Sequence, residues 1–185
     1  MKTSSKIVAA AVVLLACRSG QVAHSATSNA SKMSSAMTPR TSAADRKYLM
    51  ENAQGSVYDF ATAEVAVQKA GSKAVQDYGM QLLDDHARLN KNMLQLANRR
   101  KITLPITLDA KDKPKLMRLM RLSGATFDRS YLREAIRINA DDVNQARKEL
   151  SMTKDAEVHR VVSDFLQTEQ KHLQGAKMLL ADMSR

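Results

Sequence analysis

The sequence of 185 residues is poor in the residues that shape tight turns, since it contains only 6 Gly and 3 Pro. A sandwich, barrel or propeller needs many such turns, so this composition argues against a strand-rich fold. The glycines are too scattered for a dinucleotide-binding fingerprint, a phosphate-binding loop or a nucleophile elbow. With no Trp, 4 Tyr and 3 Phe, the chain also lacks an aromatic platform for single-stranded bases. No catalytic constellation is found, and we favour a non-enzymatic protein.

The N-terminal residues 1–16 are typical of a secretory signal peptide. Lys2 and Lys6 precede an uncharged apolar run over residues 7–15, which is too short to span a bilayer. The chain has a formal net charge of +10 and a pI near 9.9, values that often indicate nucleic-acid binding. Export would separate the protein from the nucleoid, so no nucleic acid is expected as a partner.

The single cysteine, Cys17, directly follows the apolar run. The segment Leu14-Leu15-Ala16-Cys17 resembles the lipoprotein box of bacteria, in which the cysteine is diacylated and becomes the new N-terminus. One Cys cannot close an intramolecular disulfide, and lipidation accounts for its presence in an oxidising compartment. We therefore expect a lipid anchor in the cell envelope, on the periplasmic side of the outer membrane. The alternative is an ordinary signal peptide cleaved near Ala30, which would remove Cys17.

Residues 17–42 are rich in Ser and Thr and nearly free of large apolar side chains, which predicts a disordered tether. A folded domain is expected over residues 43–185. Its first helix begins after Ser42, an N-cap with Asp45 in the first turn, and continues to about Ala70. Its expected core positions are Leu49, Ala53, Val57, Phe60 and Val67.

The second helix follows the turn Gly71-Ser72 and is capped by Ser72. Its inward positions repeat in alternating steps of four and three, as in the seam of a helix bundle. They are Val75, Gly79, Leu82, His86, Leu89, Met93 and Leu96. Gly79 is expected to let a neighbouring helix come close.

A third helix is expected from about Ala125 to Leu150, and a fourth, capped by Thr153, continues to the C-terminus. Their expected core positions are Phe127, Tyr131, Ala135, Ile138, Val143 and Ala146 in the third helix, and Val158, Val162, Phe165, His172, Leu179 and Met183 in the fourth. The connection from Arg100 to Gly124 is much longer than a bundle turn and holds a short amphipathic segment around Leu119. This pattern predicts an all-α, ferritin-like antiparallel four-helix bundle with a long crossover between helices 2 and 3.

Several short motifs in the helices resemble a ferritin-like bacterial envelope domain family of unknown function, often labelled predicted outer membrane protein. They are Glu64-Val65, Asp85-His86, Leu104-Pro105, Phe127-Asp128 with Tyr131, and His172-Leu173. The resemblance extends from about Ala44 to the C-terminus and implies a fold and an envelope location, but no activity. This chain departs from the pattern that the resemblance implies at Ile138-Asn139, where the family's third helix is expected to have Asp-His.

Glu169 and His172 have the spacing that di-iron bundles use to place a carboxylate beside an imidazole. The position that would supply the matching Glu before His86 is Leu83, so a complete di-iron centre is not expected. At about 1.5 Å per residue from the hairpin turns, His86, Glu169 and His172 lie within about two turns of one another.

Two interpretations of these residues stay open. As metal ligands, His86, Glu169 and His172 would suit zinc, copper or iron. The side chains expected beside such a site are those of Glu64, Asp85 and Asn139. As core residues, the histidines would instead be hydrogen-bonded to a neighbouring acid. The corresponding functions are a non-enzymatic envelope protein with a binding or structural role, and a metal-binding or redox ferritin-like protein in envelope stress defence.

Basic residues gather at the crossover. They are Arg99, Arg100, Lys101, Lys111, Lys113, Lys115, Arg118 and Arg121. Such a cluster favours contact with anionic lipid headgroups or polysaccharide phosphates. A solvated helix face is the alternative.

Overall fold

The computed structural model describes residues 41–184, which form five α-helices and no strand within that range. The helices are α1 (Ala43–Lys69), α2 (Lys73–Arg99), α3 (Lys113–Met120), α4 (Gly124–Met152) and α5 (Ala156–Asp182). The predicted signal peptide, Cys17 and residues 17–40 of the predicted tether lie outside the described residues. None of the helices in the described part is long and apolar enough to cross a membrane.

Local hydrogen bonds at the helix ends explain most of these boundaries. Ser42 and Asp45 form a reciprocal capping box, in which the Ser42 amide donates to Asp45 at 2.7 Å and the Asp45 amide donates to Ser42 Oγ at 3.0 Å. Ser72 accepts from the Val75 amide, as predicted. The expected cap at Thr153 is wrong, because the carboxylate of Asp155 accepts from the first amides of α5. Thr153 instead ends α4.

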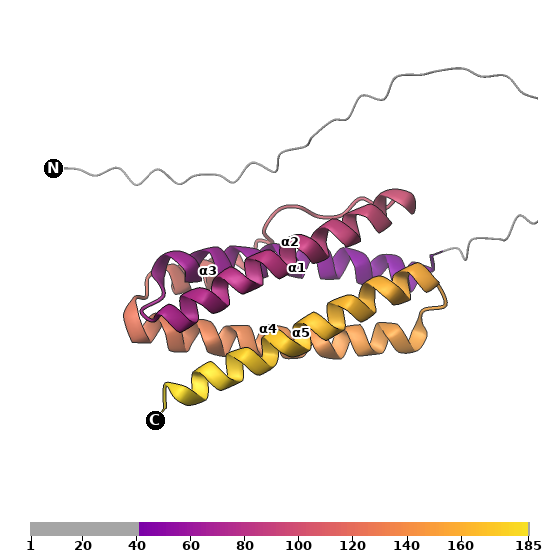
Figure 1. Cartoon of the computed structure of the whole chain (residues 1–185). Helices are drawn as coiled ribbons and strands as arrows, with labels where there is room; N and C mark the ends of the chain where they lie inside the picture. The colour runs from indigo at the N-terminus through magenta and orange to yellow at the C-terminus, as the bar shows by residue number, and fades with distance from the viewer. Residues whose placement is uncertain (1–40, 185) are drawn as a thin grey trace, which may run out of the picture. The chain divides into compact units, whose positions relative to one another are not determined.

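The long helices form two antiparallel pairs that pack on each other (Figure 1). Helix α1 pairs with α2, and α4 pairs with α5. The pairs meet where α2 contacts α5 and where α1 contacts α4. The short helix α3 lies within the crossover, where the amphipathic segment was predicted, and packs mainly on α1.

The seam predicted for α2 is confirmed, because all seven of its positions are buried. The close approach at Gly79 is also present, since a Cβ atom there would lie 3.0 Å from the Cβ of Ala66 in α1. In α5, Leu179 and Met183 are only partly buried.

The expected inner face of α1 is wrong beyond Ala53. Val57, Phe60 and Val67 are only partly buried, whereas the buried line contains Asn52, Ser56, Asp59 and Thr62. Apolar residues are distributed all around α1, so its sequence does not define one apolar stripe, and packing against α2 and α4 sets its rotation. In α4, Asn139 is similarly buried in place of the neighbouring Ile138.

A polar layer crosses the middle of the helical unit. One buried apolar cluster includes Leu49, Leu89 and Phe165, and a second includes Ala66 and Phe127. The buried polar residues between these clusters along the helices are Ser56, Asp59, Thr62, His86, Asn139, Thr168, Glu169 and His172. Burying so many polar groups is unfavourable unless they are paired. This layer is therefore the candidate location of a functional site.

Candidate metal centre

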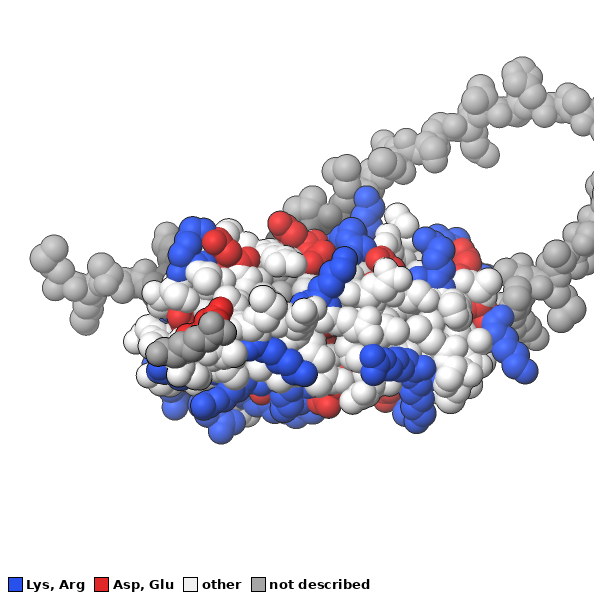
Figure 2. All heavy atoms as spheres, turned by 60° about the horizontal axis from the view of Figure 1, so that its bottom comes forward, with Lys and Arg blue, Asp and Glu red and all other residues white. Residues whose placement is uncertain are grey.

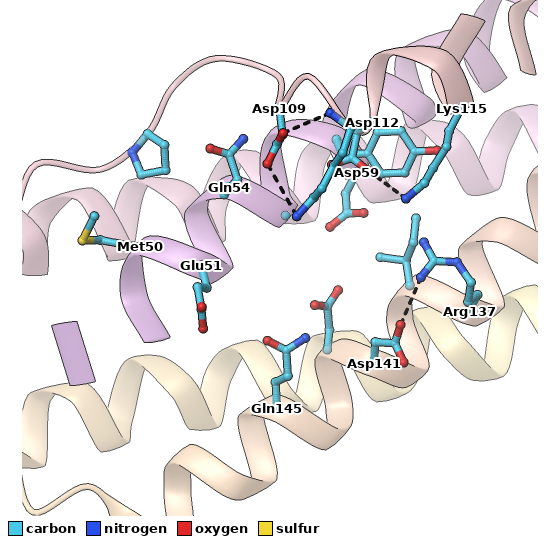
Figure 3. A pocket seen from close by; sticks show the side chains of 16 residues that line it. Met50, Glu51, Gln54, Asp59, Asp109, Asp112, Lys115, Arg137, Asp141 and Gln145 are labelled. Carbon is cyan, nitrogen blue, oxygen red and sulfur yellow. Dashed lines mark hydrogen bonds and ion pairs between the residues drawn. The ribbon is translucent and has the colours of Figure 1, made fainter. Parts of the chain in front are cut away.

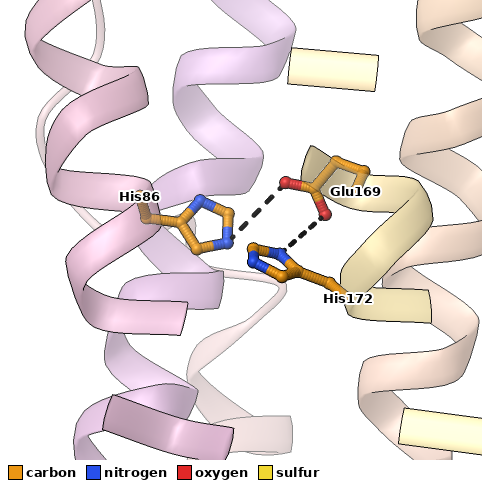
Figure 4. Close-up of side chains that lie close together, drawn as sticks. All are labelled: His86, Glu169 and His172. Carbon is orange, nitrogen blue, oxygen red and sulfur yellow. Dashed lines mark ion pairs between the residues drawn. The ribbon is translucent and has the colours of Figure 1, made fainter. Parts of the chain in front are cut away.

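Three side chains of the polar layer converge in the interior: His86 from α2, and Glu169 and His172 from α5 (Figure 4). Glu169 and His172 are one turn apart on α5, so both project from the same face of that helix. His86 reaches them because it occupies a buried seam position of α2, and α2 packs on α5. The structure therefore brings together the three residues that sequence analysis selected as ligand candidates.

Their atoms are close but not hydrogen-bonded to one another. His86 Nε2 lies 3.9 Å from Glu169 Oε1, and His172 Nδ1 lies 3.5 Å from Glu169 Oε2. His86 and Glu169 are 0 % exposed, and His172 is 1 % exposed. Both ring nitrogens of His86, both carboxylate oxygens of Glu169 and Nδ1 of His172 have no hydrogen-bond partner among the described residues. A buried polar atom without a partner costs about 1–3 kcal/mol, so this cluster is unfavourable by itself.

The remaining nitrogen of His172 has a partner outside the cluster. His172 Nε2 lies 2.9 Å from Asp85 Oδ2, a hydrogen bond in which a protonated Nε2 donates to the carboxylate. This assignment leaves Nδ1 facing Glu169. Metal-binding histidines commonly hold their second ring nitrogen to a carboxylate in this way, which orients the ring and selects the tautomer.

The surroundings shift the pKa values of the two histidines in opposite directions. Burial, together with the nearby His172, lowers the pKa of His86 and keeps its ring neutral, although Glu169 and Asp85 act in the other direction. Burial alone would lower the pKa of His172, but the carboxylates of Glu169 and Asp85 outweigh burial and raise it. Without a metal ion, His172 therefore takes up a second ring proton more readily than His86 does.

The side chains predicted beside the site have different places. Asp85 contacts His172 directly. Asn139 is buried and donates to the hydroxyl of Tyr78 at 3.1 Å, and that hydroxyl donates to the backbone oxygen of His172 at 3.0 Å. Asn139 thus supports the backbone of α5 rather than the cluster itself. Glu64 is only partly buried and makes no hydrogen bond or ion pair with the described residues, so its place beside the site stays a prediction.

Sequence analysis missed two carboxylates close to this centre, Asp59 of α1 and Asp142 of α4. Burial raises the pKa of Asp59 well above its ordinary value, and the charges of Asp142 and Glu169 add to this shift. Burial and then the charge of Glu169 raise the pKa of Asp142 to about 8. A weak signal existed for Asp59, because Ser56, Asp59 and Thr62 follow helical spacing along one face of α1.

Many basic residues of the crossover are tied to carboxylates. Arg100 is 13 % exposed and lies 2.9 Å from both Asp155 and Glu157, and Arg99 lies 3.1 Å from Glu157. Lys111 and Lys115 likewise have partners within the crossover, whereas Lys101, Lys113, Arg118 and Arg121 have no ion pair among the described residues. Lys and Arg also line the lower margin of the face shown in Figure 2, which brings α4 and α5 forward. Positive charge is therefore not confined to the crossover.

The fold and the cluster together define an all-helical protein with a buried His-Glu-His constellation. The chain belongs to the family described as a domain of unknown function, DUF4142, which it matches over residues 30–179. This assignment agrees with the unknown activity that the sequence motifs implied, but the label of an outer membrane protein has no support from it. No curated protein matches the chain.

Two solved structures share the fold at low sequence identity. A DUF305 fragment from Deinococcus radiodurans is similar with a TM-score of 0.70 and 13 % identity, covering 78 % of this chain and 99 % of its own. CopM in its Cu(I)-bound form is similar with a TM-score of 0.63 and 17 % identity, covering 75 % of this chain and 96 % of its own. At these identities the comparisons establish the helical fold alone.

Proposed function

We propose that this protein binds one transition-metal ion through His86, Glu169 and His172. The observation that carries the proposal is that these buried residues each offer one donor atom within 4.8 Å of the other two, and that their side chains carry nitrogens and oxygens without hydrogen-bond partners. A tetrahedral ion with bonds of about 2.1 Å holds its ligand atoms about 3.4 Å apart. His172 Nδ1 lies 3.5 Å from Glu169 Oε2 and His86 Nε2 lies 3.9 Å from Glu169 Oε1, so small side-chain movements would bring one donor atom of each residue to that separation.

The donor types restrict the ion. Two imidazoles and one carboxylate suit zinc, copper or iron, whereas calcium and magnesium prefer oxygen ligands alone. Three protein ligands leave one position of a tetrahedron for a water molecule or another ligand. Copper receives additional support because the structurally similar CopM is described in a Cu(I)-bound form. A role in metal binding or in metal-dependent stress defence follows more directly from this donor set than a purely structural role.

The alternative is a metal-free core, in which a protonated His172 lies between Asp85 and Glu169. That arrangement places His172 between two carboxylates, with a hydrogen bond from Nε2 to Asp85, but leaves both ring nitrogens of His86 without a hydrogen-bond partner. The two alternatives therefore differ most at His86, because a metal ion gives one of its ring nitrogens a partner and the ion pair gives neither one.

The test is metal binding by the purified, chelator-treated protein. Zn²⁺, Cu²⁺ and, under reducing conditions, Cu⁺ and Fe²⁺ are titrated, with bound metal and melting temperature as the readouts. We expect near-stoichiometric binding of one of these ions and a rise in melting temperature, because an ion that binds only the folded state stabilises it by about 2.7 kcal/mol at one hundred times its Kd.

His86→Leu and His172→Leu should each abolish both effects, and His159→Leu is the matched control because its imidazole lies on the exposed side of α5. If the parent binds none of these zinc, copper and iron ions, or if the control loses binding as well, the proposal is wrong.

We further propose the setting in which this site works. The predicted lipid at Cys17 would attach the ferritin-like four-helix unit to the periplasmic side of the outer membrane. The crossover cations without carboxylate partners, Lys101, Lys113, Arg118 and Arg121, would then be available to anionic headgroups or polysaccharide phosphates. The support for this setting is the lipoprotein box and the charge of the crossover.

A further inference from the structure

A second cluster of unpaired carboxylates lies at a pocket between α1, α4 and the crossover (Figure 3). The pocket has a volume of about 670 Å³ and is lined by Asp59 and Asp142. Asp59 is only 5 % exposed, and its side chain points into the pocket. No described residue donates a hydrogen bond to the carboxylate of Asp59, and Oδ2 of Asp142 is also without a partner.

The other charges of the pocket do not neutralise these two groups. Lys111 pairs with Asp109 at 3.5 Å, and Lys115 pairs with Asp112 at 2.9 Å. Arg137 bonds to Glu134 and Asp141, at 2.8 and 3.0 Å. Each cation that lines the pocket thus has a carboxylate partner of its own.

Glu169 does not line the pocket, but its charge adds to the negative potential there and raises the pKa of both Asp59 and Asp142. A buried and a partly buried carboxylate without cationic partners are unfavourable when both are ionised, and they either retain protons or take up a cation. A pocket of this volume admits a hydrated ion, with water completing its coordination.

We infer that Asp59 and Asp142 form a second cation site, which takes a divalent ion that prefers oxygen ligands, such as Mn²⁺. Carboxylate and water ligands select ions of this class over those that prefer imidazole. This inference goes beyond the proposed function, because Asp59 and Asp142 line a pocket that His86, Glu169 and His172 do not line.

The experiment follows binding of Mn²⁺ to the purified, chelator-treated protein by the loss of the electron paramagnetic resonance signal of the free ion. We expect saturable binding, weakened about tenfold or more in the double variant Asp59→Asn, Asp142→Asn. Asp141→Asn is the matched control, because Asp141 lines the same pocket but is exposed and paired with Arg137. This control should bind Mn²⁺ as the parent does.

Two further measurements keep the result unambiguous. In the parent, bound Mn²⁺ should broaden the nuclear magnetic resonance signals of Tyr58, which lines the pocket, without any substitution. The His86→Leu protein should retain Mn²⁺ binding, so failure of the His-Glu-His centre and failure of this site give different results. A parent that leaves the free-ion signal unchanged, as expected if the two carboxyls simply keep their protons, overturns the inference. So does a double variant that folds and binds Mn²⁺ like the parent.

Discussion

Glu149 of α4 should make the stability of the helical unit depend on pH in a defined direction. Its side chain is buried, at 3 % exposure, and its carboxyl faces Asp45 in the first turn of α1. The pKa of Glu149 is raised from 4.5 to about 7. Burial is the largest cause, and the hydrogen bond with Asp45 and the negative charge of Asp45 add to it. Burial would also raise the pKa of Asp45, but hydrogen bonds from Glu149, Ser42 and Thr153 outweigh burial and lower it. Glu149 therefore holds the proton of this pair while Asp45 stays ionised.

The sign follows from the protons bound in each state. Between a pKa of 4.5 in the unfolded chain and about 7 in the folded protein, the folded state keeps a proton that the unfolded chain releases. The free energy of unfolding therefore falls as the pH rises through this window, and the loss is complete above it. At about 1.4 kcal/mol per pKa unit, the upper limit of this loss is roughly 3 kcal/mol. Glu149 borders a surface pocket that admits water, so we expect a loss of about 1–3 kcal/mol.

Replacing Glu149 by Gln removes the charge and keeps a group that can donate to Asp45. The Glu149→Gln protein should match the parent near pH 5 and exceed its stability near pH 8 by about 1–3 kcal/mol, measured by urea unfolding. Glu51→Gln is the control, because Glu51 is exposed and paired with Lys47, and its effect should not change with pH. If the difference between Glu149→Gln and the parent is the same at both pH values, the carboxyl pair does not titrate as argued.

Two other substitutions test packing and anchoring. Gly79→Ala should lower the free energy of unfolding by up to about 2 kcal/mol. The new Cβ would lie 3.0 Å from the Cβ of Ala66 and 3.3 Å from the backbone oxygen of Ala63. The cost of this crowding exceeds the gain in helix propensity. Gly55→Ala is its matched control, since nothing lies within 4 Å of that Cβ, and it should be neutral or stabilising by up to about 1 kcal/mol. Cys17→Ser should move the protein from the membrane to the soluble fraction of fractionated cells, because two acyl chains are enough for stable anchoring; unchanged membrane association would mean that lipid at Cys17 is not what holds it.

The sequence alone determined the helical class, the bounds of α1 and α2 within a residue or two, and the seam of α2. These features are local, because caps such as Ser42 and Ser72 act on amides a few residues away, and the repeat from Val75 to Leu96 defines one face of α2 by itself. The neighbouring position of Glu169 and His172 is likewise a consequence of helical spacing. Counting from the hairpin turns was enough to bring His86 to their level.

The tertiary structure decided what depends on the rotation and contact of different helices. Apolar residues surround α1, so only its packing against α2 and α4 shows that Asp59 faces inward while Val57 is partly exposed. The pocket beside Asp142 exists because the crossover passes over α1 and α4, which no local pattern describes. The contact between Asp85 and Nε2 of His172 also required the structure, because it depends on how α2 packs against α5 and not on a spacing within one helix.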